Sequence, residues 1–163
     1  MSENGFDSPE AAAMSTFPAE YCSVVATRTQ GDHAYVLLDT GPPDRPYLYG
    51  VNCHREGGRW FEGGSSNGPG WEQTHNDPDL GTLSCWSDVP MGVEFVRIVF
   101  DGAVIDEPVQ NRAYLLVRFG VPCPSECLRV IAVRRSEDWE AESDLGLVLR
   151  VAAERGYGSG GTA

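Results

Sequence analysis

The sequence predicts an all-β domain, an antiparallel β-sandwich of about seven to nine strands with Ig-like or jelly-roll-like topology and a short C-terminal helix. Three observations predict this class. Short segments rich in β-branched and aromatic residues recur along the chain, turn-forming clusters separate them about every 8 to 12 residues, and no helix-length segment lies between them. Because parallel strands need such crossover segments, we expect antiparallel strands.

In the first half of the chain, side-chain alternation predicts four strands, at residues 21–29, 34–39, 47–54 and 59–62. The first two form a hairpin across the turn-forming residues 30–33. Three prolines and a glycine in residues 40–46 predict a loop. The four glycines of Gly63–Gly70 predict irregular structure.

In the second half, strands are predicted at residues 82–86, 94–101, 103–105, 113–119 and 128–135. The spacing of Leu145, Val148, Leu149 and Ala152 is typical of one face of a helix and predicts a helix over residues 143–155. Gly146 leaves a strand as the alternative there. The predicted organisation is a flexible lead-in at 1–19, a single domain at 20–155 and a flexible tail at 156–163.

The chain carries 24 acidic residues against 12 basic ones, a formal net charge of −12, and every base is an arginine. Nucleic-acid binding depends on Lys and Arg that displace counterions, so this charge excludes a nucleic-acid partner. It disfavours an anionic membrane surface for the same reason. Between Glu72 and Glu107 lie eight acids and one base, a local net charge of −7. Such a surface favours a basic protein partner, and an alternative function is an immunity-type inhibitor that masks a basic site.

Five cysteines, an odd number spread along the chain, predict free thiols in the cytoplasm rather than a disulfide framework. Residues 1–20 contain no base and no apolar stretch of the kind that marks a secretory signal, which also favours the cytoplasm. Cys123 and Cys127 form one close thiol pair, whereas structural zinc sites need two. We therefore predict no metal and no cofactor.

Aromatic side chains flank the glycine-rich segment and predict a binding surface, because flat rings beside polar groups can stack on a sugar or anchor a protein. Packing in the core is the competing interpretation for each tryptophan except Trp71, which follows a glycine and is expected to be exposed. The predicted site residues are Tyr47, Tyr49, Trp60, Asn67, Trp71 and Trp86. We expect a non-catalytic, soluble binding domain that engages a protein or a glycan.

One short motif predicts a different function. The run Val36-Leu37-Leu38-Asp39-Thr40-Gly41 resembles the active-site signature of the aspartic peptidases, in particular the small homodimeric retroviral type. The resemblance implies that Asp39 is catalytic and that two such carboxylates share one proton and activate water. Because the chain has one Asp-Thr-Gly, activity would require a symmetric dimer. The competing interpretation is a turn at the end of a strand.

Overall fold

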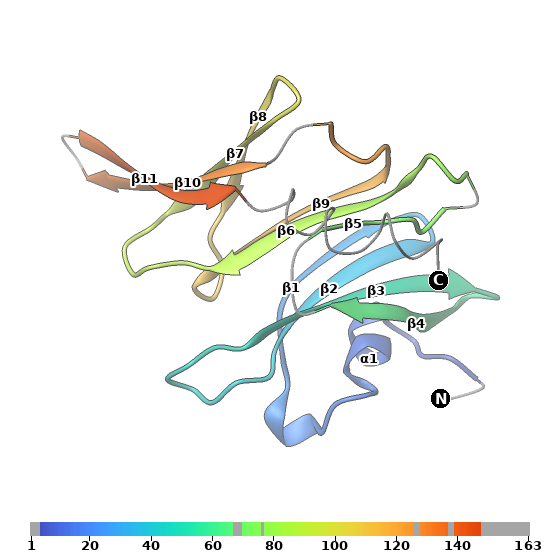
Figure 1. Ribbon diagram of the computed structural model, residues 1–163. Helices are drawn as coiled ribbons and strands as arrows, with labels where there is room; N and C mark the ends of the chain where they lie inside the picture. Colours follow the sequence, from blue (N-terminus) through green and yellow to red (C-terminus); the bar gives the residue numbers. More distant parts are fainter. Residues whose placement is uncertain (1–3, 67–69, 76, 126–127, 137–138, 148–163) are drawn as a thin grey trace, which may run out of the picture. The chain divides into compact units, whose positions relative to one another are not determined.

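A computed structural model of the chain describes residues 4–66, 70–75, 77–125, 128–136 and 139–147 (Figure 1). The chain divides into two compact units, unit 1 at Met1–Gly68 and unit 2 at Pro69–Ala163. The single domain expected at 20–155 stays a prediction. The expected mostly β fold of antiparallel sheets is confirmed, and none of the sheets of the described residues is closed.

Unit 1 is one four-stranded antiparallel sheet with a short helix packed against it (Figure 1). Its strands follow the order of the sequence, β1-β2-β3-β4, because each is joined to the next as a hairpin neighbour. The elements are α1 (Pro9–Met14), the 3₁₀ helix η1 (Ala19–Tyr21), β1 (Ser23–Gln30), β2 (His33–Asp39), β3 (Leu48–Glu56) and β4 (Arg59–Ser66).

Helix α1 lies in the segment that was expected to be a flexible lead-in. Ser8 caps it, since the Ser8 Oγ accepts a hydrogen bond of 3.1 Å from the backbone N–H of Ala11, and Pro9 occupies the first turn. Ala12 and Ala13 are completely buried in the core of unit 1. Alanine lets the helix backbone approach the sheet closely, so a helix of six residues is held by packing rather than by its own stability.

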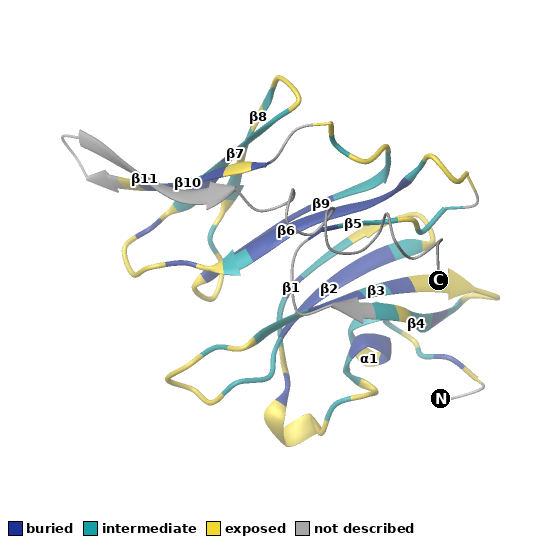
Figure 2. Ribbon diagram, in the orientation of Figure 1, coloured by how far each residue is buried: buried dark blue, intermediate teal, exposed yellow. Residues whose placement is uncertain are grey.

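Strand β2 is buried on both faces (Figure 2). Val36 and Leu38 belong to the core that includes α1, while Tyr35 and Leu37, which alternate with them, are also buried. This central strand ends at Asp39, so the loop that follows begins from a fixed point of the sheet.

Arg59 fastens the N-terminal segment to the outer edge of β4. Its guanidinium donates hydrogen bonds of 3.0 Å to the backbone oxygens of Asn4 and Gly5 and forms an ion pair with Asp7. Beside it, the backbones of Phe6 and Trp60 exchange two hydrogen bonds of 2.8 Å. The edge of the sheet is covered at this point by the chain itself, which satisfies groups that an edge strand leaves unpaired.

Arg59→Ala is therefore expected to loosen this segment and to lower the free energy of unfolding by about 1–2 kcal/mol, because two charge-assisted hydrogen bonds to backbone oxygens and the ion pair with Asp7 are lost at a partly exposed site. Hydrogen exchange at the amides of Phe6 and Trp60 should become faster. Arg59→Lys is the matched control, since it keeps the charge and loses the planar fork, and it should give an intermediate rate. Unchanged exchange in Arg59→Ala would contradict the role given to Arg59.

Unit 2 contains two antiparallel sheets, of order β5-β6-β9 and β11-β10-β7-β8. One hydrophobic cluster draws on both, with Leu83 and Leu116 from the first sheet and Ile98 and Val130 from the second. The strands are β5 (Gly70–Glu72), β6 (Gly81–Asp88), β7 (Phe95–Phe100), β8 (Ala103–Pro108), β9 (Ala113–Val121), β10 (Arg129–Ser136) and β11 (Trp139–Leu147).

The predicted C-terminal helix is wrong in its described part. Residues 139–147 form strand β11, which pairs with β10 across a register shift at Val130 and Ile131. The spacing of the apolar residues is compatible with a helix, but Gly146 lowers the helix preference of the segment. Pairing of β11 with β10 then outweighs the weak helix preference that remains. Residues 148–155 of that prediction, and the predicted tail at 156–163, lie outside the described residues.

Neither helix in the described part of the chain has the length and apolar character needed to cross a bilayer.

Candidate binding site

The structure buries two of the predicted aromatic site residues. Trp60 is 6% exposed and belongs to the core of unit 1, and Trp86 is 5% exposed in β6. Trp71 is half-buried rather than exposed: it packs against the core of unit 2, and its indole N–H donates a hydrogen bond of 2.9 Å to the backbone oxygen of Val121. These three side chains therefore serve packing at least in part, as large aromatic residues commonly do.

The two predicted tyrosines of unit 1 differ from each other. Tyr49 is half-buried and meets the ring of Phe17 edge-on, with 5.4 Å between centroids. Tyr47 is 53% exposed, and its hydroxyl has no hydrogen-bond partner among the described residues. Asn67 lies outside the described residues. The predicted set is thus divided between the two units, and Tyr47 is its most accessible described member.

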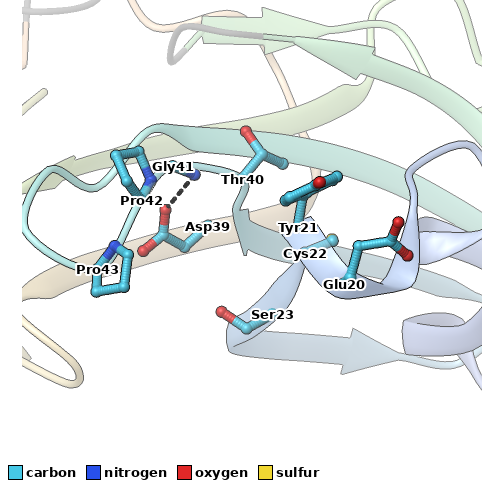
Figure 3. Close-up of a pocket in the computed structure, with 9 residues that line it drawn as sticks. All are labelled: Glu20, Tyr21, Cys22, Ser23, Asp39, Thr40, Gly41, Pro42 and Pro43. Carbon is cyan, nitrogen blue, oxygen red and sulfur yellow. Dashed lines mark hydrogen bonds between the residues drawn. The ribbon is translucent and has the colours of Figure 1, made fainter.

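A pocket of about 540 Å³ opens in unit 1 where β2 ends and β1 begins (Figure 3). One wall comes from the last residues of η1 and the first of β1, and the other from the Asp39-Thr40-Gly41 turn and the two prolines after it. Most of these residues are at the surface (Figure 2), so the pocket is accessible to a ligand. The lining residues are Glu20, Tyr21, Cys22, Ser23, Asp39, Thr40, Gly41, Pro42 and Pro43.

Hydrogen bonds from both ends close the loop at 40–46. Asp39 Oδ1 accepts a bond of 2.9 Å from the Gly41 N–H (Figure 3) and one of 3.0 Å from the Tyr47 N–H. The Thr40 N–H donates to the Tyr47 backbone oxygen at 2.9 Å, and the Thr40 hydroxyl donates to the same oxygen at 3.2 Å. A carboxylate at the end of a buried strand therefore holds the loop in one shape.

Gly41 is needed because the loop backbone passes very close to it. A Cβ at this position would lie 2.2 Å from the Arg45 backbone oxygen and 2.6 Å from the Tyr47 nitrogen. Neither group is a flexible side chain that could move aside. The Asp-Thr-Gly sequence thus has a structural role here: an acceptor, a hydroxyl that reinforces closure, and a residue without a side chain where two backbone segments meet.

The chemistry of the pocket is that of an anionic site with an aromatic wall. Glu20 and Asp39 supply carboxylates, and no basic residue lines the pocket. Asp39 Oδ2 and the Glu20 carboxylate have no hydrogen-bond or ion-pair partner among the described residues. Tyr21, on the wall opposite Asp39 in Figure 3, is 67% exposed.

Cys22 supplies the one thiol among the residues that line the pocket. Burial, and next the nearby Asp39 carboxylate, raise the pKa of the Cys22 thiol above its ordinary value. Among the other thiols of the described residues, burial raises the pKa of Cys53 to about 12 and that of Cys85 to about 11. Since the thiolate is the reactive form, these thiols are suited to packing rather than to catalysis.

Asp39→Asn is expected to increase the alkylation rate of Cys22 at pH 8, because removal of the carboxylate takes away one of the two causes that raise the thiol pKa and so raises the thiolate fraction. In the wild type the rate should reach its midpoint at a pH above that of an ordinary cysteine. The measurement is iodoacetamide labelling followed by mass spectrometry. Asp44→Asn is the matched control, since Asp44 is an exposed acid of the same loop that does not line the pocket. Equal rates in the two variants would contradict the electrostatic link.

No group of three or more His, Cys, Asp or Glu side chains in the described part of the chain is placed to hold a metal ion. Cys123 is exposed, and its neighbour in the predicted pair, Cys127, lies outside the described residues. In the acidic stretch Glu72–Glu107, Asp106 is engaged locally, since it forms an ion pair of 3.0 Å with Arg97. That surface remains a prediction.

Sequence reasoning identified Asp39 and Tyr47 but missed Glu20 and Tyr21. The pairing of β1 with β2 is the feature that could have revealed these two residues. Ser23 pairs with Asp39, so the residues just before Ser23 lie beside the loop that follows Asp39. A β-bulge between Val24 and Ala26 shifts this register by one residue. Simple counting from the turn therefore could not place the two segments against each other.

Comparison of the chain with protein-family models, with curated proteins and with solved structures gave no match.

Proposed function

We propose that this chain is a non-catalytic binding domain for a protein partner and that the pocket of unit 1 is its binding site. The observation that carries the proposal is the pocket between the η1–β1 wall and the closed loop at 40–46, with two exposed tyrosines, Tyr21 and Tyr47, on or beside it. Tyrosine is enriched at protein interfaces because it offers a large rigid surface and a polar end.

The closed loop supports binding because it lowers the entropic cost of association. Bonds at Asp39, Thr40 and Tyr47 fix the loop before any partner arrives, and Arg45 adds a turn bond of 3.0 Å to the Pro42 oxygen. A site that is ordered before binding loses less conformational entropy when the partner binds, so more of the interaction free energy appears as affinity. Pro42 and Pro43 add exposed apolar surface whose backbone is restricted in advance.

A non-catalytic role agrees with the state of the two reactive groups. One oxygen of Asp39 already accepts two backbone N–H bonds, and the Cys22 thiol has a raised pKa.

We also propose that unit 2 is a small sandwich, since residues of its two sheets share one hydrophobic cluster. The acidic stretch Glu72–Glu107 is proposed as a second, steering surface for a basic partner.

Photo-crosslinking from position 47 tests the binding function. Benzoylphenylalanine can replace Tyr47 with little change to the loop, because the bonds that Tyr47 makes there use its backbone. We expect a discrete crosslinked protein in the native lysate, and we expect Tyr21→Ala in the same chain to remove it. The same probe at Met91, which is 79% exposed in unit 2, is the control. Adducts that form equally from Met91, or that persist in Tyr21→Ala, would contradict the proposal.

One observation favours the aspartic peptidase as a second candidate: Asp39 lines a pocket at the end of an apolar strand. This function requires two copies of Asp39 in contact across a two-fold axis. Sedimentation equilibrium distinguishes the candidates. A dimer whose peptide cleavage is abolished by Asp39→Asn would support the peptidase, and a monomer would exclude it.

A further inference from the structure

We propose that the pocket of unit 1 receives an arginine side chain presented by the protein partner. This inference rests on the proposed binding function and names the chemistry of the partner. The pocket combines unpaired carboxylates with an exposed aromatic ring, and these are the groups that recognise a guanidinium ion.

The carboxylates that line the pocket are the groups that a cation would meet. In the described part of unit 1, the acids Asp7 and Asp32 are paired with Arg59 and Arg55, and the other acids have no such cation among the described residues. Of these other acids, Asp39 and Glu20 line one pocket. The pocket is therefore a place where the chain leaves negative charge uncompensated, and a ligand with a positive charge would compensate it.

Asp39 Oδ1 is occupied by two backbone N–H groups, so the carboxylate is held in one orientation while Oδ2 keeps its lone pairs. Tyr21 belongs to the other wall of the pocket and is 67% exposed, so its ring can cover the face of a planar cation. A fixed acceptor on one wall and a ring on the other suit a group that both donates hydrogen bonds and stacks.

Arginine fits this arrangement better than lysine does. Its guanidinium is planar, stacks on aromatic rings and can at the same time donate an N–H to a single open carboxylate oxygen such as Asp39 Oδ2, whereas an ammonium group is a strongly hydrated point charge. The pocket volume of about 540 Å³ accommodates the guanidinium with its aliphatic stem. The net charge of −12 adds long-range attraction for a basic partner.

The Cys22 thiol lines the pocket together with Asp39 and can report on its charge. Burial, and next the Asp39 carboxylate, raise the pKa of this thiol. A bound cation would oppose this effect. Binding of arginine should therefore shift the titration of Cys22 towards lower pH.

Backbone amides report directly on the site, because the N–H groups of Gly41 and Tyr47 donate to Asp39. The test is a titration of the ¹⁵N-labelled full chain with N-acetyl-arginine amide at constant ionic strength, followed by amide chemical shifts. Saturable shifts are expected at Gly41, Tyr47 and Cys22. N-acetyl-lysine amide should bind more weakly, and the neutral isostere N-acetyl-citrulline amide should give no saturable shift.

Asp39→Asn should weaken arginine binding about tenfold, since the amide oxygen still closes the loop while an NH2 group replaces Oδ2 and cannot accept a hydrogen bond from the guanidinium. Glu20→Gln is a second variant that does not touch the loop and should weaken binding to a smaller extent. Asp44→Asn, which removes an equal charge from outside the pocket, should leave binding unchanged. Equal binding of citrulline and arginine, or equal effects of Asp39→Asn and Asp44→Asn, would overturn the inference. A partner crosslinked from position 47 whose binding is unaffected by Asp39→Asn would overturn it too, while leaving the proposed binding function intact.

Discussion

Trp60→Ala is expected to lower the free energy of unfolding by about 3–5 kcal/mol, the usual cost of removing a large aromatic side chain from a core. The ring is 6% exposed and packs in the cluster that contains Ala12 and Ala13. The Arg55 guanidinium lies over it, 5.4 Å from the ring centroid. The cavity left by alanine would remove contacts with the helix and the sheet together. Urea unfolding followed by far-ultraviolet circular dichroism measures the loss.

Tyr47→Ala is the control, because an exposed side chain should change stability by no more than about 0.5 kcal/mol. Comparison of these two variants distinguishes a residue of the core from a residue of the binding site. Trp60→Ala should reduce stability, and Tyr47→Ala should reduce binding in a chain that remains folded. If Trp60→Ala cost less than about 1 kcal/mol and abolished partner capture, Trp60 would belong to the site rather than to the core.

Gly41→Ala is expected to open the loop at 40–46 and to abolish binding at the pocket. The added Cβ would lie 2.2 Å from the Arg45 oxygen, so the backbone must move and the bonds from Thr40 and to Asp39 must lengthen or break. Such a clash costs about 1–3 kcal/mol. We expect arginine-amide binding to fall by more than about tenfold, and the amide of Tyr47 to exchange faster.

Gly31→Ala is the control for Gly41→Ala. Gly31 has φ +59° in the β1–β2 turn, and a Cβ there would meet nothing within 4 Å. Its cost, about 1 kcal/mol, comes from the left-handed backbone alone. Arginine-amide binding should be unchanged in this variant. Full binding by Gly41→Ala would show that the closed shape of the loop is not what forms the site.

Strands could be predicted from the sequence because alternation of side chains is a local signal. The predicted segment 34–39 became β2 (His33–Asp39), and 113–119 became β9 (Ala113–Val121). The glycine-rich segment was less predictable. Strand β4 continues into it as far as Ser66, because pairing with β3 offsets the low strand preference of glycine, with a register shift between Asn52 and Cys53.

Helix α1 was missed although its capping signals are present in the sequence. Ser8, Pro9 and Glu10 form a typical N-terminus, but a helix of six residues has no periodic apolar face to detect. Its stability comes from contacts with strands far along the chain, such as the Cys53 thiol that donates to the Pro9 oxygen at 3.6 Å. Local sequence carries no information about those partners.

Only one wall of the candidate site could be predicted from the sequence. The Asp39 turn is a local motif, whereas the exposure of Tyr47 could not be predicted, because Val51 and Cys53, which alternate with it along the strand, are buried. Trp71 was expected to be exposed, yet it finds a partner at Val121, fifty residues away. Such a long-range hydrogen bond depends on the pairing of strands β5, β6 and β9, which the sequence pattern does not determine.

Hydroxyl-radical footprinting with the crosslinked partner, once purified, tests the central claim most directly. In the free chain Tyr21 and Tyr47 are accessible, and Met91 in unit 2 is an internal reference at 79% exposure. We expect the partner to lower the oxidation of both tyrosines by about tenfold and to leave that of Met91 unchanged. Unaltered oxidation of Tyr21 and Tyr47 in the complex would contradict it, since the pocket of unit 1 would then be open while the partner is bound.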